Sequence, residues 1–268
     1  MTPTFSLNSK NNIPQIGLGV WQIRNDQVAQ VVVWALAAGY RHIDTAKVYG
    51  NEVGVGLGIA QSGLKRTDIF VTTKLYLTDI LDPQRGLHDS LTRLGLDYVD
   101  LYLIHWPFPF WQSAWKKMST LVDSGLTKSI GVSNFSIKQL EALKKLGGFI
   151  PAVNQIELSP FSYKKELVDY CQSQGIIVEA YSPLTHGHLI QNQKISRLAA
   201  KYQHTNPQIL LRWGLQHNFV ILPKSTSQNH LKDNLNIFDF EINSSDMAQL
   251  DSLNQNYSVL FPGWSPQK

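Results

Sequence analysis

An aspartate and a tyrosine lie five residues apart in the segment RHIDTAKVYGNE, which runs from Arg41 to Glu52. The apolar run before it, residues 28–38, predicts a helix, so residues 41–44 would form the next strand. Asp44 then ends this strand, and Tyr49 lies in the loop above the strand's carboxyl end. A carboxylate and a phenol held this close predict a site that donates protons.

Lys74 and His105 would complete such a site. A phenol with a reference pKa near 10 protonates an alkoxide slowly at neutral pH, so its pKa must be lowered. An ammonium about 4 Å away contributes on the order of 4 kcal/mol at an effective dielectric constant near 20, enough for Lys74 to lower the pKa of Tyr49 by up to about three units. Asp44 would keep Lys74 charged. His105 would donate a hydrogen bond to a substrate carbonyl, with Trp106 as an apolar wall.

Short β-rich runs alternate with amphipathic helical patterns from residue 16 onward. The eight β-rich runs are residues 16–20, 41–44, 69–75, 99–104, 129–132, 153–157, 176–180 and 220–222. Helical patterns between them include residues 83–94, 112–122, 137–146, 164–174 and 194–202. Alternating β and α units predict a parallel sheet with outer helices, and eight units in one chain favour a closed (β/α)8 TIM barrel.

An open, doubly wound sheet is the alternative to the barrel. The dinucleotide-binding pattern Gly-x-Gly-x-x-Gly does not follow an early strand, because the glycine-rich run GVGLG at residues 54–58 lies within a helical segment. We therefore favour the barrel, as a single domain over residues 1–268. Residues 5–13 predict an N-terminal β-hairpin that closes the barrel floor.

Residues able to do chemistry fall at the carboxyl ends of the expected strands, where barrels of this class place their catalytic groups. Taken singly, a strand-end lysine is typical of a charged surface, and a lone histidine of a hydrogen-bonded core group. Their convergence on one end of the barrel favours a site instead. In chain order they are Asp44, Lys74, His105, Ser133 with Asn134, Gln155, Tyr181, and Lys224 with Ser225.

Composition excludes several classes of function. The single cysteine, Cys171, excludes an intramolecular disulfide and a cysteine-based zinc site, and favours a reducing compartment, so we expect a cytoplasmic protein. No apolar run approaches the roughly 20 residues that span a bilayer, so we expect no membrane association. The net charge of +4 is spread over scattered lysines and arginines, which argues against a nucleic-acid partner.

The motifs resemble those of the aldo-keto reductases from about residue 5 to residue 255. The similarity is carried, in order, by GYRHIDTA (39–46), YGNE (49–52), Lys74, HWP (105–107), GVSNF (131–135), NQIE (154–157), YSPL (181–184), residues 207–213 and LPKS (222–225). It is closest to the compact bacterial reductases of the 2,5-diketo-D-gluconate and methylglyoxal type. The resemblance implies that Asp44, Tyr49, Lys74 and His105 form a catalytic tetrad, with Tyr49 as the general acid and NADPH as the hydride donor.

The resemblance also assigns a cofactor groove. Tyr181 would stack on the nicotinamide, while Ser133, Asn134 and Gln155 would bind its carboxamide. An aromatic face suits a flat ring, and polar side chains suit an amide that both donates and accepts. The remaining contacts implied are Ser182 and Leu184 with the pyrophosphate and adenosine, Lys224, Ser225 and Thr226 near the 2′-phosphate, and Asn234 near the adenine.

His230 is a departure from the family pattern, which carries an arginine here in NADPH-specific members. A guanidinium grips a phosphate with two hydrogen bonds, whereas a histidine with a pKa near 6.5 is mostly neutral at pH 7. Losing one charge-assisted contact is worth roughly 1.5–3 kcal/mol. We therefore expect NADPH to be preferred and NADH to be usable.

Aromatic residues should form the substrate pocket. We expect Trp21, Tyr76 and Trp106 nearest the tetrad, followed by Phe108, Phe110, Trp111 and the C-terminal residues Phe261 to Trp264. Such walls favour partly apolar carbonyl compounds: small aldehydes, 2-oxoaldehydes or keto sugars. We expect a monomer without a metal. The alternatives are a regulatory or structural nucleotide-binding barrel, and a metal-dependent hydrolase or isomerase, for which one aspartate and one histidine are too few ligands.

Overall fold

Eight short parallel strands carry the fold. A computed structural model describes residues 2–260, and the C-terminal residues 261–268, including the expected aromatic tail, lie outside the described part. The strands are β3 (Leu18–Gly19), β4 (His42–Asp44), β5 (Phe70–Leu75), β6 (Leu101–Ile104), β7 (Ile130–Ser133), β8 (Val153–Glu157), β9 (Ile177–Tyr181) and β10 (Val220–Leu222). Each pairs with the next along the chain. A parallel bridge between Ile16 and Ile221 brings the first and last segments together, which confirms the barrel.

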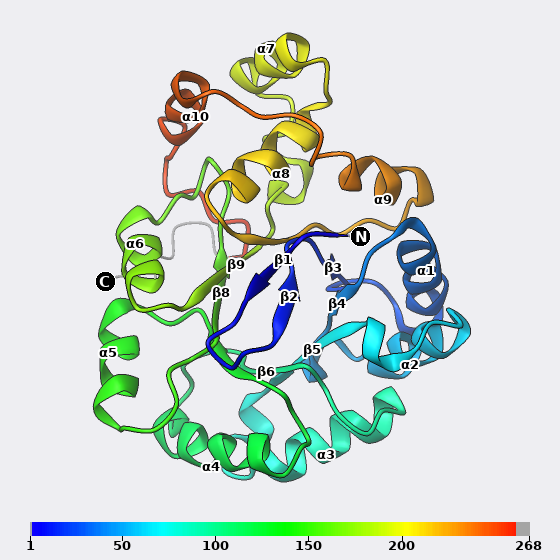
Figure 1. Cartoon of the computed structure of the whole chain (residues 1–268), viewed down its shortest axis with the longest axis vertical. Coiled ribbons are helices and arrows are strands. Elements are labelled where there is room, and N and C mark those ends of the chain that lie inside the picture. Colours follow the sequence, from blue (N-terminus) through cyan, green and yellow to red (C-terminus); the bar gives the residue numbers. More distant parts are fainter. Residues whose placement is uncertain (1, 261–268) are drawn as a thin grey trace.

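Helices surround the strands (Figure 1). They are α1 (Asn25–Ala38), α2 (Glu52–Gln61), α3 (Pro83–Leu94), α4 (Trp111–Asp123), α5 (Ile137–Lys145), α6 (Lys165–Ser173), α7 (Gln193–Tyr202), α8 (Asn206–Gln216), α9 (Gln228–Leu235) and α10 (Ser244–Asp251). Local sequence explains their starts. The Asp82 carboxylate accepts from Arg85 N at the start of α3, and Thr205 forms a capping box with Gln208 at the start of α8.

The N-terminal hairpin closes one end of the barrel, as predicted. Strands β1 (Thr4–Ser6) and β2 (Asn12–Pro14) pair antiparallel, and they lie across the centre of the barrel in Figure 1. Buried Leu7 and Ile13 form one apolar cluster with the first residues of four barrel strands, Phe70, Leu101, Val153 and Val220. Since these are the amino ends of the strands, the hairpin lies at the floor and leaves the carboxyl ends open.

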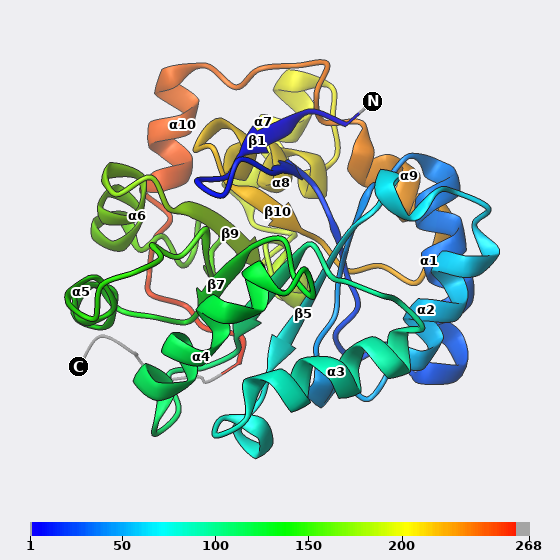
Figure 2. The same cartoon turned by 60° about the horizontal axis from the view of Figure 1, so that its bottom comes forward.

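Glycines let α2 pack closely against α1 and α3, which lie side by side with it in Figures 1 and 2. A Cβ atom on Gly56 would lie 2.0 Å from the carbonyl oxygen of Leu94, and one on Gly58 would lie 2.6 Å from that of Ala29. The glycine-rich run therefore serves helix packing, as its position within a helical pattern indicated. This packing fixes the start of α2, which directly follows the loop that carries Tyr49.

Candidate active site

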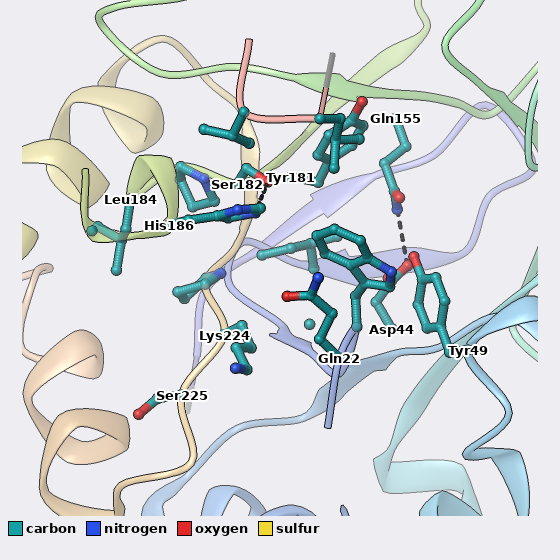
Figure 3. A pocket seen from close by; sticks show the side chains of 18 of the residues that line it. Gln22, Asp44, Tyr49, Gln155, Tyr181, Ser182, Leu184, His186, Lys224 and Ser225 are labelled. Atoms are coloured by element: carbon teal, nitrogen blue, oxygen red, sulfur yellow. Dashed lines mark hydrogen bonds between the residues drawn. The ribbon is translucent and has the colours of Figure 1, made fainter. Parts of the chain in front are cut away.

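A cavity of about 1110 Å³ opens at the carboxyl ends of the strands. Asp44, Tyr49 and His105 line it at one end, and Ser225 and His230 line it toward α9. Figure 3 shows Asp44 and Tyr49 close to Gln155 on one side of this pocket, with Lys224 and Ser225 farther along it. Residues expected from strand ends throughout the chain therefore converge on one space.

Lys74 lies beneath this pocket with no exposed surface. Its Nζ donates to Asp44 Oδ1 at 2.6 Å, to the Thr45 carbonyl at 2.9 Å and to Tyr49 Oη at 3.4 Å. The three hydrogens of the ammonium thus face three oxygens. Lys74 is charged in this position, because Asp44 and Tyr49 outweigh the effect of burial and raise its pKa.

Tyr49 ends a short 3₁₀ helix, Lys47–Tyr49, that is tied to its surroundings on two sides. Lys47 forms an ion pair with Asp79, in the loop after β5. Asn51 donates to the carbonyls of Val20 and Ile23, which joins the Tyr49 loop to the loop that carries Trp21. These contacts fix the phenol relative to the end of β5, where Lys74 lies.

The pKa of Tyr49 is raised, which corrects the expected direction. Burial is the largest cause, and the nearby Lys74 ammonium opposes it without cancelling it. The phenol therefore keeps its proton throughout the neutral range. Burial, assisted by the charge of Lys74, holds the pKa of His105 well below its usual range, so this imidazole is neutral. The rings of Tyr49 and His105 pack edge to face, with 5.7 Å between their centroids.

The residues expected to bind the nicotinamide form one hydrogen-bonded group. Tyr181 Oη donates to Asn134 Oδ1 at 2.9 Å, and Asn134 Nδ2 donates to Ser133 Oγ at 3.0 Å. Ser133 Oγ donates in turn to the backbone carbonyl oxygen of Gln155 at 2.9 Å. All four line the pocket. With its hydroxyl anchored, the Tyr181 ring has a fixed position along the pocket wall.

Gln155 leads to a layer of polar groups that the motifs did not reveal. Its Nε2 donates to Asp44 Oδ2 at 2.9 Å and to Glu179 Oε2 at 2.5 Å. Glu179 has no exposed surface, and His42 beside it has none either. A signal existed in the sequence, because a charged residue inside the apolar strand Ile177–Tyr181 must be neutralised or paired.

Most of the residues expected to hold the nucleotide phosphates share the far end of the pocket. Ser182, Leu184, Lys224, Ser225, Thr226 and His230 all line it. The first turn of α9 also begins here, at the N-cap Ser227, and the amino end of a helix favours anions. Asn234 is elsewhere: it lies buried on α9 beside the Tyr40 hydroxyl and is not among the described lining residues, because α9 turns this side chain inward.

Aromatic residues line the end of the pocket that holds Tyr49 and His105. Trp21, Tyr76 and Trp106 are lining residues, as expected. Phe108 packs edge to face on Tyr76, whereas Phe110 is 62% exposed and Trp111 is buried against Phe135, so these last two do not form the wall. Sequence patterns missed His186, which faces Trp21 at 5.4 Å between ring centroids, and the wall residues Val259 and Leu260.

Within residues 2–260, no cluster of three or more histidine, cysteine or acidic side chains could hold a metal ion. Over the same residues, no helix combines the length and apolar character needed to cross a membrane.

A barrel with a protonated phenol beside a buried ammonium, next to a long groove with a lysine, defines a class of nucleotide-dependent reductases. Comparison with known proteins agrees. The Aldo/keto reductase family model matches residues 15–255. Glyoxal reductase of Bacillus subtilis (strain 168) is 42% identical over 260 residues, covering 96% of this chain and 94% of the relative. Glycerol 2-dehydrogenase (NADP(+)) of Saccharomyces cerevisiae is 39% identical over 301 residues, covering 99% and 96%.

Solved structures give the same result. An aldo/keto reductase from Brucella melitensis superimposes with a TM-score of 0.91 at 44% identity, covering 95% of this chain and 100% of that one. An aldo-keto reductase from Bombyx mori, in complex with NADP, gives a TM-score of 0.90 at 37% identity, with coverage of 97% and 95%. The chain belongs to the aldo/keto reductase family. It is an NADP-dependent oxidoreductase that reduces carbonyl groups.

Proposed function

We propose that this protein reduces small aldehydes, 2-oxoaldehydes or keto sugars to alcohols, with Tyr49 as the general acid. One observation carries the proposal: Lys74 Nζ lies 2.6 Å from Asp44 Oδ1 and 3.4 Å from Tyr49 Oη, directly below a large pocket. A buried ammonium is costly unless it is paired, so its placement against a phenol at a pocket needs a chemical reason.

The residues that line the pocket are suited to binding NADPH. Lys224, Ser225 and Thr226 would hold the 2′-phosphate near the start of α9, and Tyr181 would support the nicotinamide. Ser133, Asn134 and Gln155 would bind the carboxamide, and Ser182 with Leu184 would contact the middle of the cofactor. His230 would leave NADH usable. Bound NADPH supplies the hydride.

Each group of the tetrad then has a separate task. Neutral His105 donates a hydrogen bond that orients the substrate oxygen. Tyr49 gives its proton to this oxygen as the carbonyl carbon is reduced, so the C=O double bond becomes a C–OH group. Lys74 stabilises the tyrosinate that remains, until a proton from solvent restores the phenol. Asp44 keeps Lys74 charged and aimed at Tyr49.

Substrate size follows from the walls. Trp21, Tyr76 and Trp106 would enclose a small, partly apolar carbonyl compound beside His105. Similarity to a glyoxal reductase supports dicarbonyl substrates in particular.

We also propose that the protein is a single-domain monomer of the cytoplasm. The residues proposed above for the tetrad and the cofactor groove all belong to this chain, as a monomeric enzyme requires. The single cysteine, Cys171, is buried, which fits a reducing compartment. Light scattering after size-exclusion chromatography should give the monomer mass of 30.2 kDa.

The test is NADPH oxidation with methylglyoxal or 4-nitrobenzaldehyde, comparing wild type with Tyr49→Phe. The variant keeps the ring but lacks the acid, so kcat should fall by about 10²- to 10⁴-fold. NADPH binding, followed by quenching of tryptophan fluorescence, should persist. Tyr98→Phe is the matched control, because Tyr98 precedes β6 at the opposite end of the barrel. Equal rates in wild type and Tyr49→Phe would refute the role of Tyr49, and NADPH binding without reduction in wild type would favour a regulatory barrel.

A further inference from the structure

Two buried ionisable groups below the tetrad have no task in the mechanism above. Glu179 precedes Tyr181 by two residues on β9, and His42 precedes Asp44 by two residues on β4. Side chains two apart on a strand point to the same side, so both groups face the barrel interior one layer below the pocket. Neither has any exposed surface. Such groups are costly to bury unless they are hydrogen-bonded or paired.

The two hydrogens of the Gln155 amide connect Glu179 to the tetrad. One points to Asp44 Oδ2 at 2.9 Å and the other to Glu179 Oε2 at 2.5 Å. An amide nitrogen carries only two hydrogens, so both are engaged below the pocket, and the amide oxygen remains for the pocket that Gln155 lines. Figure 3 shows the Gln155 amide reaching toward Asp44 beside Tyr49.

We propose that Glu179 is a positioning residue for carbonyl reduction: it clamps the Gln155 amide against Asp44 and so keeps Lys74 aimed at Tyr49. The chain of contacts runs from Glu179 through Gln155 to Asp44 Oδ2, and from Asp44 Oδ1 to Lys74 Nζ at 2.6 Å. Glu179 is not among the described lining residues of the pocket, so it would act through Gln155. This inference rests on the proposed function, because it assigns Glu179 to the same reaction.

The surroundings of Glu179 favour its neutral form. The groups facing it are Gln155 from β8, Asp44 and His42 from β4, and Lys74 from β5. Lys74 is the one cation among them, and Asp44 already balances it. His42 is neutral, because burial lowers its pKa to about 3, and its Nε2 lies 3.0 Å from Thr72 Oγ1. Burial and the charge of Asp44 accordingly raise the pKa of Glu179 to about 8.

Loss of the Glu179 proton should slow the reaction. A second anion in this layer repels Asp44 across the shared amide. It also raises the pKa of Tyr49 further, which makes the phenol a weaker acid. The reduction rate should therefore fall as the pH rises through the range in which Glu179 ionises.

Two substitutions distinguish the hydrogen bond that Glu179 accepts from Gln155 from the effect of its ionisation. Glu179→Gln keeps an oxygen that accepts from Gln155 but cannot ionise, whereas Glu179→Leu removes the acceptor. We would measure kcat with methylglyoxal at saturating NADPH from pH 6 to 10, together with the Kd for NADPH. Glu179→Gln should stay within about threefold of wild type at pH 7, and its alkaline fall should move up by about one pH unit or more. Glu179→Leu should lose about tenfold or more in kcat.

Asp246→Asn is the control for substitution of a buried carboxyl group. Asp246 lies on α10, and its carboxylate accepts hydrogen bonds from Lys201 and Tyr202 rather than from residues of the tetrad. It should leave the pH profile unchanged. If Glu179→Leu does not fold, the Glu179→Gln profile decides. An alkaline midpoint in Glu179→Gln equal to that of wild type, or full kcat in Glu179→Leu, overturns the role of Glu179. If the role of Glu179 is overturned but Tyr49→Phe is inactive, the proposed function still holds. If Tyr49→Phe is active, the proposed function is wrong as well.

Discussion

The Nζ atom of Lys74 lies 2.6 Å from Asp44 Oδ1, in a part of the barrel where Lys74 has no contact with solvent. A pair buried this deeply gains little net stability, because desolvation offsets most of the attraction. Removing one partner is much more harmful than removing both, since a lone buried charge remains. Single and double substitutions at Lys74 and Asp44 should therefore affect catalytic activity and the free energy of unfolding differently.

Lys74→Met should lower both properties. Asp44 would keep only the Gln155 hydrogen bond, and the free energy of unfolding should fall by about 3–5 kcal/mol. The reduction rate should fall by about 10²-fold or more, because Tyr49 loses the cation that stabilises its anion. Urea unfolding and kcat with methylglyoxal provide the two measurements.

The double variant Lys74→Met with Asp44→Leu is the decisive comparison. It should recover most of the lost stability, because no buried charge is left unpaired, while remaining as inactive as Lys74→Met. A double variant less stable than the single one would contradict this account of the pair.

The pH dependence tests the protonation state of His105. Its pKa is held well below 6.5 by burial and by Lys74, so the imidazole stays neutral as the pH falls through 6.5. We expect kcat/KM for methylglyoxal to show no step near pH 6.5, down to about pH 5. A step near pH 6.5 that disappears in His105→Gln would show that the imidazole titrates normally, against this prediction.

Strand positions followed directly from the sequence, because each buried parallel strand reads as a short apolar run between helical patterns. The expected runs 153–157 and 220–222 coincide with β8 (Val153–Glu157) and β10 (Val220–Leu222). Knowing that strand ends meet at the barrel mouth was then enough to gather Asp44, Tyr49 and His105 around one pocket.

What sequence reasoning missed depends on side-chain direction and on burial. Asn234 is turned inward on α9, and Trp111 packs against Phe135, which motif spacing alone does not reveal. The direction of the Tyr49 pKa also required the structure, because it is a balance between burial and the Lys74 charge. Glu179 was missed because no family motif marks it, and its contact with Gln155 depends on side-chain direction inside the barrel.

Cofactor preference should respond to His230, which lines the phosphate end of the pocket. His230→Arg adds a permanent charge with paired donors, so the ratio of kcat/KM for NADPH to that for NADH should rise by about tenfold or more. Steady-state kinetics with both cofactors measure this ratio. His88→Arg adds the same charge on the exposed surface of α3 and should leave the ratio unchanged. An equal response in the two variants would mean that total charge, rather than a local contact, governs preference.

Stability should depend on the close packing of α2, even though α2 holds no expected catalytic residue. Alanine favours a helix over glycine by about 1 kcal/mol, so Gly56→Ala would stabilise an exposed helix. Here the added Cβ would lie 2.0 Å from the Leu94 carbonyl oxygen, and α2 and α3 would have to separate. We expect a net loss of about 1–3 kcal/mol in the free energy of unfolding, measured by urea titration. Leu57→Ala on the same helix should change it little, because Leu57 is 53% exposed. A Gly56→Ala variant more stable than wild type would mean that this helix contact yields at no cost.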